Sequence, residues 1–176
     1  MTTRMAVIPA RGGSTRLKDK NIFPINGKPL ICYTIEEVIK TKLFDKIYVS
    51  TDSDAIAKVA SEYAEVEIYS REAEFSGERI TVVSALIDMM SKVEVCDQFA
   101  YFLPTCPFRN SEDISKGVNL LTESVDSVFS ACHYDDPPQL AMIHGHDDYA
   151  YPVFDNLRAG VTNSKYITKY IKPSGG

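Results

Sequence analysis

An apolar run that leads directly into a cationic, glycine-containing loop constrains this chain most. Residues 5–8, Met-Ala-Val-Ile, are continuously apolar, which is typical of a strand buried on both faces of a parallel sheet. Residues 9–21 follow with two adjacent glycines and a local charge of +3, from four cations and one carboxylate, in a chain of formal net charge -5. The sequence therefore predicts the first strand of an α/β sheet with an anion-binding loop at its carboxyl end.

The loop has the chemistry of a polyphosphate site. Gly12 and Gly13 allow backbone N–H groups to approach an anion closely, and the hydroxyl of Ser14 adds a donor. Arg11 and Lys20 supply full positive charges. The glycine spacing matches neither the dinucleotide-binding fingerprint nor the P-loop. A solvated loop after an edge strand is the plainer alternative, but the apolar strand before the loop favours a phosphate site.

Composition limits the class of protein. The chain has 176 residues, which suits one well-buried domain, so we expect residues 1–176 to form a single domain. The negative net charge argues against a general binder of nucleic acid or anionic membrane, and no apolar run approaches the ~18 residues of a membrane span. Because the N-terminus lacks a signal peptide and the four cysteines lack paired spacing, we expect a cytoplasmic protein with reduced thiols.

Helix and strand signals alternate along the chain, as in a sheet built from βαβ units. Apolar residues at helical spacing and capping residues predict helices over residues 30–39, 54–63, 82–90 and 111–121. Apolar runs and alternation predict further strands over residues 46–50, 65–69, 99–103 and 127–131. The pattern indicates a three-layer, Rossmann-like α/β fold with a mostly parallel central sheet.

Three predicted strands end in chemistry-bearing residues. They lead into the basic loop, into Asp52, and into the turn Pro104-Thr105-Cys106-Pro107. Because parallel strands place their carboxyl ends at one edge of a sheet, we expect these three to meet along one rim. Plainer roles are open for two residues: Asp52 is at least as consistent with a helix cap as with catalysis, and Arg109 suits a surface ion pair with Glu112 or Asp113.

The organisation changes after residue 133. The run Asp135-Asp136-Pro137-Pro138 breaks regular structure, and the residues that follow have no clear period. We expect residues 134–170 to form an excursion from the sheet that serves dimerisation, with a long surface loop as the alternative. A metal site is a further alternative here, although histidines in an irregular acidic segment are more often solvated. The histidines concerned are His133, His144 and His146.

An ordered set of motifs resembles one protein family. The motifs are Ile-Pro-Ala-Arg-Gly-Gly-Ser at residues 8–14 with Lys20 and Asn21, Val-Ser-Thr-Asp at 49–52, and Leu-Pro-Thr-Cys-Pro-Phe-Arg at 103–109. Together they resemble the acylneuraminate cytidylyltransferases, also called CMP-sialic acid synthetases, over about residues 5 to 135. The resemblance implies a nucleotidyltransferase domain and an enzyme that transfers CMP from CTP to the 2-hydroxyl of a nonulosonic acid, a nine-carbon 2-keto sugar acid, releasing pyrophosphate.

The same resemblance assigns candidate site residues. Arg11 and Lys20 are the expected catalytic residues, because both offset phosphate charge and Lys20 is placed to stabilise the transition state. Arg71 is expected near the cytosine, and Thr81 in the same pocket. The full set of expected CTP-binding residues is Ala10, Arg11, Gly12, Gly13, Ser14, Lys20, Asn21, Arg71 and Thr81.

Two departures from the family pattern concern the acceptor and the metal. Leu103 stands where the family usually has a glutamine that contributes to sugar recognition, so the acceptor differs or is bound by other groups. The chain resembles a C-terminally short member: Mg²⁺ is expected from the family, but its usual aspartate ligands lie in a part that this chain lacks. Among residues 162–172, Lys165 is a candidate partner for the acceptor carboxylate.

The expected partners are CTP, the sugar acid and a second copy of the chain in a homodimer, with neither nucleic acid nor membrane. Two other functions stay open from the sequence. One is a nucleotide-binding but inactive remnant that associates with a full-length partner. The other is a nucleotidyltransferase that uses another nucleoside triphosphate on a sugar phosphate.

Overall fold

The computed structural model divides into two compact units, Met1–Asp126 and Ser127–Gly176, and each is described by itself. It describes residues 2–14, 17–77, 80–146, 149–161 and 168–173, without the side chains of residues 156 and 157. Arg16 of the basic loop and Lys165, the candidate acceptor contact, lie outside the described residues. That residues 1–176 form one nucleotidyltransferase domain stays a prediction.

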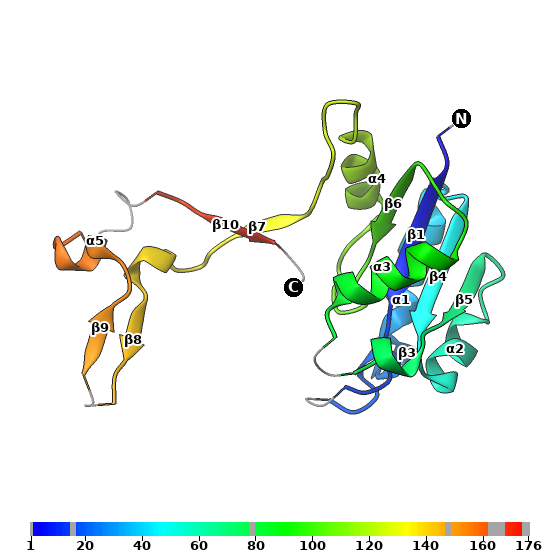
Figure 1. The fold of residues 1–176 in the computed structure, drawn as a ribbon, viewed down its shortest axis with the longest axis horizontal. Coiled ribbons are helices and arrows are strands. Elements are labelled where there is room, and N and C mark those ends of the chain that lie inside the picture. Colours follow the sequence, from blue (N-terminus) through cyan, green and yellow to red (C-terminus); the bar gives the residue numbers. More distant parts are fainter. Residues whose placement is uncertain (1, 15–16, 78–79, 147–148, 162–167, 174–176) are drawn as a thin grey trace. The chain divides into compact units, whose positions relative to one another are not determined.

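The first unit is built on a four-stranded parallel sheet of order β5-β4-β1-β6 (Figure 1). Its strands are β1 (Arg4–Pro9), β4 (Lys46–Thr51), β5 (Val66–Ser70) and β6 (Gln98–Tyr101). The central strand β1 is buried from Met5 to Pro9, as its continuous apolar run predicted. Because all the pairings are parallel, the four carboxyl ends lie at the same edge of the sheet.

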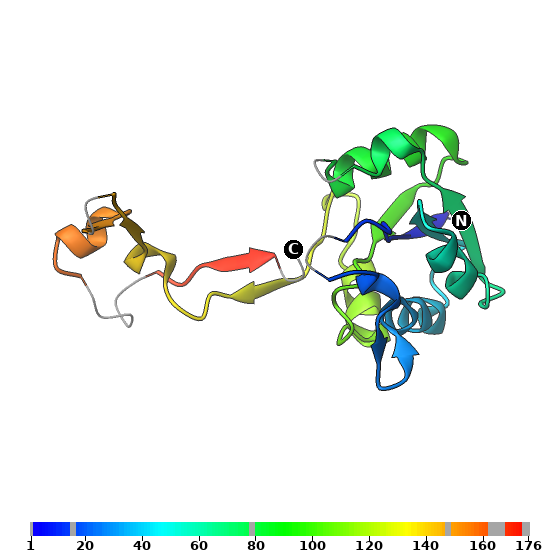
Figure 2. The same cartoon turned by 90° about the horizontal axis from the view of Figure 1, so that it is seen from below.

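Helices cover both faces of this sheet (Figures 1 and 2). They are α1 (Leu30–Thr41), α2 (Asp54–Ala60), α3 (Val82–Lys92) and α4 (Ser111–Asn119). Ala6 and Ile8 of β1 share one core cluster with residues of α1, α2 and α4. Met5 and Val7 point to the opposite face and pack with Leu86 and Met89 of α3. The three-layer fold predicted from the sequence is confirmed.

Side-chain caps start three of these helices as the sequence predicted. Ser53 Oγ accepts from the Ile56 N–H at 3.5 Å, and Asn110 Oδ1 accepts from the Asp113 N–H at 2.9 Å. Thr81 plays the same part for α3. Helix α2 ends at Ala60, short of the predicted residue 63, because the chain turns there.

A short hairpin, β2 (Pro24–Ile25) and β3 (Lys28–Pro29), connects the basic loop to α1. Its turn residues Asn26 and Gly27 have φ of 50° and 78°, the left-handed pair that a tight hairpin requires. Two single 3₁₀ turns are present: η1 (Lys20–Ile22) ends the basic loop, and η2 (Ala73–Phe75) follows β5. In the described part of the chain no helix has the length and apolar character needed to cross a bilayer.

The predicted strand over residues 127–131 is wrong except at its last residue. Strand β7 covers Ala131–His133 and pairs antiparallel with β10 (Ile171–Pro173) in the second unit. The preceding apolar residues pair with no strand among the described residues, and Phe129 is 67% exposed. A segment with an apolar pattern forms a strand only where a neighbouring strand pairs with it, and the pattern does not show whether such a neighbour exists.

The second unit also holds regular structure that the sequence did not reveal. Strands β8 (Met142–His144) and β9 (Ala150–Pro152) form an antiparallel hairpin, with η3 (Pro138–Leu140) before it and α5 (Asp155–Arg158) after it. Each of these strands has three residues, which is too short for a period to be recognised. The dimerisation role expected for residues 134–170 stays a prediction.

Candidate nucleotide-binding site

The basic loop begins where β1 ends against β4. The Ala10 N–H donates to the Ser50 carbonyl at 2.9 Å, so the parallel ladder continues one residue beyond β1. Ala10 is fully buried in the core, so neither its side chain nor its main chain is exposed. A direct part in CTP binding for Ala10 stays a prediction.

Gly12 packs against the turn between β4 and α2. Its N–H donates to Asp52 Oδ1 at 2.8 Å, and a Cβ built on Gly12 would lie 2.9 Å from the Cβ of Ser53. The residue is therefore a glycine because the turn leaves no room for a side chain. Nothing lies within 4 Å of a Cβ built on Gly13, which leaves that glycine as the one open to an anion. The loop then tightens, since the Ser14 N–H donates to the Gly12 carbonyl at 2.8 Å.

Asn21 closes the loop from its far end. It is 5% exposed, and its Nδ2 donates to the main-chain carbonyl of Arg11 at 3.0 Å. The Arg11 guanidinium extends the other way and donates from Nη1 to the Gly77 carbonyl at 3.2 Å. Both ends of the basic loop are thus held, one by the buried amide and one by the segment after η2.

Lys20 lies next to Asn21 at the start of η1. Its N–H donates to the Leu17 carbonyl at 3.3 Å, and its own carbonyl accepts from the Phe23 N–H at 3.2 Å. The preceding Asp19 is left-handed, with φ 52°. Among the described residues the Lys20 ammonium makes no ion pair. Lys20 is half-buried and its main chain is hydrogen-bonded, so it presents an uncommitted positive charge at the loop.

Arg71 lies at the end of β5 but binds the end of β4. Its Nη2 donates to the Ser50 carbonyl at 2.9 Å, and its Nε and Nη2 each lie 3.3 Å from Ser50 Oγ. Burial lowers the pKa of Arg71, the Asp52 carboxylate raises it, and the Arg11 guanidinium lowers it further. The structure brings Arg71, Arg11 and Asp52 into one electrostatic neighbourhood; contact of Arg71 with a cytosine stays a prediction.

Thr81 uses its hydroxyl to begin α3. Its Oγ1 accepts from the Ser84 N–H at 3.1 Å and lies 2.8 Å from Ser84 Oγ. Its expected place in the nucleotide pocket stays a prediction.

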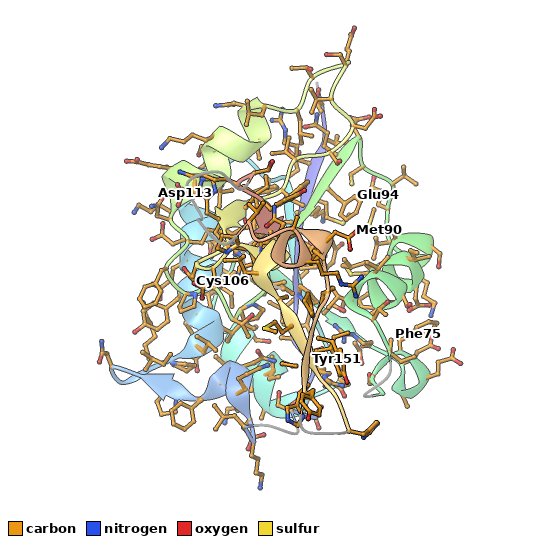
Figure 3. All side chains as sticks on the ribbon, turned by 90° about the vertical axis from the view of Figure 1, so that its left-hand side faces the viewer. Phe75, Met90, Glu94, Cys106, Asp113 and Tyr151 are labelled. Carbon is orange, nitrogen blue, oxygen red and sulfur yellow. The ribbon has the colours of Figure 1, made fainter. Side chains whose placement is uncertain are left out.

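The segment that links Arg71 to Thr81 is itself tied to α3. Lys92 Nζ lies 2.7 Å from Glu72 Oε1 and 2.7 Å from Asp88 Oδ1. It also lies 5.7 Å from the ring centroid of Phe75, which is labelled in Figure 3. These contacts stabilise the 3₁₀ turn η2, and that turn leads to the Gly77 carbonyl that Arg11 binds.

The Pro-Thr-Cys-Pro turn follows β6 at the same edge of the sheet. The Cys106 N–H donates to the Leu103 carbonyl at 3.3 Å, and the Arg109 N–H donates to the Cys106 carbonyl at 3.2 Å (Cys106 is labelled in Figure 3). The Arg109 guanidinium stands 5.3 Å from the ring centroid of Phe102. Among the described residues it makes no ion pair with Glu112 or Asp113, so the alternative of a surface ion pair is wrong. Burial lowers the pKa of Arg109.

Sequence reasoning missed Ser50, Gly77 and the loop-binding role of Asp52. Ser50 is 1% exposed at the end of an apolar strand, and a buried hydroxyl at a strand end was a usable signal. Gly77 acts through its main-chain carbonyl, for which no side-chain pattern exists. The sequence leaves Asp52 open as a cap for α2 or a catalytic group; Ser53 provides the cap, and Asp52 binds the Gly12 N–H.

The expected Mg²⁺ has no ligand set in the described part of the chain. No three His, Cys, Asp or Glu side chains gather there in an arrangement that could hold a metal ion. The requirement for Mg²⁺ stays a prediction.

Comparison with known proteins identifies the family. Residues 5–150 match the cytidylyltransferase family. The N-acylneuraminate cytidylyltransferase of Escherichia coli O18:K1:H7 is 32% identical over 176 residues, which cover 99% of this chain and 41% of that protein. The CMP-N,N'-diacetyllegionaminic acid synthase of Legionella pneumophila is 37% identical over 130 residues, 72% of this chain and 56% of that protein. The chain thus spans about half the length of these relatives.

A solved structure supports the fold. CMP:2-keto-3-deoxy-manno-octonic acid synthetase complexed with CTP superposes with a TM-score of 0.67 at 18% identity, covering 99% of this chain and 72% of that one. At that identity the likeness concerns the fold alone. The family match and the two relatives confirm the resemblance predicted from the motifs: the chain belongs to the cytidylyltransferase family and is of the acylneuraminate cytidylyltransferase type.

Proposed function

We propose that the chain belongs to an enzyme that transfers CMP from CTP to the 2-hydroxyl of a nonulosonic acid. The observation that carries the proposal is the basic loop at the carboxyl end of β1, with its backbone held by Asn21 and Asp52 and with the Lys20 ammonium free of ion pairs among the described residues. The names of the two relatives, one for N-acylneuraminate and one for N,N'-diacetyllegionaminic acid, support a nonulosonic acid as acceptor.

In the proposed reaction the 2-hydroxyl oxygen of the sugar acid attacks the α-phosphorus of CTP. A new P–O bond forms, the bond from the α-phosphorus to the oxygen bridging to the β-phosphate breaks, and pyrophosphate leaves with that electron pair. The hydroxyl proton passes to solvent. Negative charge grows on the bridging oxygen, so the reaction requires cations beside the phosphates. We assign this role to Lys20 and Arg11.

The remaining residues are assigned to binding. Gly13 and the Ser14 hydroxyl face the phosphates, because Gly12 is occupied by the β4–α2 turn. Ala10, Gly12 and Asn21 support the loop backbone. Arg71 and Thr81 line the nucleotide pocket from the segment that follows β5. Leu103 leaves recognition of the sugar to other groups.

A homodimer built through residues 134–170 and a cytoplasmic location complete the proposal. Light scattering on the purified chain tests the oligomeric state: the mass of two chains supports the dimer, and the 19.6 kDa of one chain overturns it. Nucleic acid and membrane are not among the proposed partners.

The activity is tested with CTP, Mg²⁺ and three acceptors offered separately: N-acetylneuraminate, N,N'-diacetyllegionaminate and pseudaminate. Detection of a CMP-sugar and of pyrophosphate in equal amounts supports the proposal. A folded protein that binds CTP but makes no product with any acceptor indicates the inactive remnant. A thermal-shift panel of CTP, UTP, dTTP and GTP tests the nucleotide, because stabilisation follows affinity; no preference for CTP overturns the cytidylyl assignment.

A further inference from the structure

We propose that Asp52 is a positioning residue of the basic loop: its carboxylate holds the Gly12 N–H and so fixes the backbone that receives the triphosphate. The ligand in this inference rests on the proposed function. The central contact is the 2.8 Å hydrogen bond from the Gly12 N–H to Asp52 Oδ1, which joins residues 40 positions apart. A hydrogen bond with an ionised acceptor is among the stronger ones in proteins.

The backbone that carries Asp52 is well fixed. Thr51 is 2% exposed, and its Oγ1 accepts from the Ser53 N–H at 3.1 Å. Ser53 caps α2, whose Ile56 is buried in the core. The strand end before Asp52 is also tied to β1, through the Ala10 N–H on the Ser50 carbonyl at 2.9 Å. Because its backbone is held in this way, the Asp52 carboxylate restrains the Gly12 N–H that it binds.

Packing and the hydrogen bond act on the same residue of the loop. A Cβ on Gly12 would lie 2.9 Å from Ser53 Cβ and 3.8 Å from Asp52 Oδ1, so the Gly12 backbone is in direct contact with the turn. The contact limits how near the loop comes, and the hydrogen bond limits how far it moves away. The backbone direction at Gly13 and Ser14 is therefore defined by the restrained Gly12.

The negative charge of Asp52 allows a positioning role to be distinguished from a purely electrostatic effect on CTP affinity. The Asp52 carboxylate attracts the buried Arg71 guanidinium, yet beside bound phosphates it repels the ligand. If Asp52 acted only through its charge, any neutral residue there would strengthen CTP binding. If it positions the loop, the outcome depends on whether the neutral residue keeps the acceptor for Gly12.

Two neutral variants separate the possibilities. Asp52→Asn removes the charge and keeps a side-chain oxygen for the Gly12 N–H, whereas Asp52→Ala removes both. By calorimetry we expect the dissociation constant of CTP to be unchanged or lower in Asp52→Asn and about tenfold higher in Asp52→Ala. Asp54→Asn and Asp54→Ala are the matched controls, because this exposed carboxylate two residues away makes no hydrogen bond to the loop among the described residues. The two control variants should bind CTP alike.

A second readout needs no nucleotide. Amide hydrogen exchange at Gly12, followed by NMR in the ligand-free protein, should be about tenfold faster in Asp52→Ala and near the wild-type rate in Asp52→Asn. Asp52→Ser, with a shorter side chain, replaces the alanine variant if circular dichroism shows that the latter is unfolded. Equal exchange in the neutral variants, with equal CTP affinity, overturns the positioning role. If the wild type binds no CTP, the proposed function fails, and the exchange rates still decide the role of Asp52.

Discussion

The side-chain amide of Asn21 donates a hydrogen bond to the main-chain carbonyl of Arg11 at 3.0 Å and closes the basic loop across ten positions of sequence. Asn21 is 5% exposed, so this contact is a buried polar anchor, in addition to the hydrogen bond from the Arg11 guanidinium to the Gly77 carbonyl. The contact uses the main chain of Arg11 and leaves the Lys20 ammonium, which makes no ion pair among the described residues, available for a ligand.

Replacing Asn21 tests this anchor. Asn21→Ala leaves the Arg11 carbonyl without its partner, and we expect a loss of about 1–3 kcal/mol in the free energy of unfolding by urea. Asn21→Asp should cost more, because an ionised carboxylate has no N–H and faces the carbonyl with a second acceptor. Asn119→Ala, on the exposed last residue of α4, is the control and should stay within about 0.5 kcal/mol of wild type. Wild-type stability of Asn21→Asp contradicts the anchor.

The two glycines of the loop should respond differently to alanine. Gly12→Ala places a methyl group 2.9 Å from Ser53 Cβ, and we expect overpacking to lower the free energy of unfolding by about 1–3 kcal/mol. Gly13→Ala meets nothing within 4 Å and should unfold near the wild-type urea concentration while it binds CTP more weakly. Urea unfolding and calorimetry on both variants distinguish these effects. Equal stability of the two variants shows that Gly12 does not pack as described.

The hydrogen bonds of Asp97 predict part of the loss in folding stability at acid pH. The Thr3 N–H and the Thr3 hydroxyl donate to its Oδ2 at 2.7 and 3.0 Å, and these bonds hold the pKa of Asp97 below its ordinary 3.8. A depressed pKa means that the unfolded chain takes up the proton first. The stabilisation is complete above the unfolded value and is lost as the pH falls through the folded one.

Asp97→Asn should therefore be less stable than wild type at pH 7, and its stability should fall less steeply below about pH 4. Urea unfolding across the acid range measures both effects. Glu123→Gln, at an exposed carboxylate that no described residue binds, is the control and should follow the wild-type curve. If the free energies of unfolding of Asp97→Asn and wild type fall in parallel as the pH is lowered, the prediction is wrong.

The sequence predicted the sheet and the loop well because β1 carries an unbroken apolar run, and because each capping residue acts within three residues of itself. It did not predict which groups hold the loop. The contact of Asp52 with Gly12 depends on the path of the loop, and the contact of Arg71 with Ser50 depends on the β4–β5 register, in which Thr51 lies beside Ser70. Neither relation is visible in local spacing.

The incorrect prediction of a strand over residues 127–131 also arises because strand pairing is non-local. Residues 127–131 are apolar at three of their five positions, but only the predicted strand over residues 99–103 has β1 as a neighbour, with Val7 beside Tyr101. The pairing partner of β7 lies some forty residues away, at Ile171–Pro173. Non-local pairing of such short segments leaves almost no trace in the sequence.

CMP-sugar formation by wild type and by Lys20→Ala, with the CTP affinity of each measured in parallel, tests the central claim most directly. We expect product from wild type, at least about a hundredfold less from Lys20→Ala, and a much smaller change in CTP affinity, because the ammonium acts on charge that grows in the transition state. Lys58→Ala, at an exposed lysine of α2, should match wild type in both measurements. Equal losses of turnover and affinity in Lys20→Ala, or no product from a folded wild type with any acceptor, contradict the account.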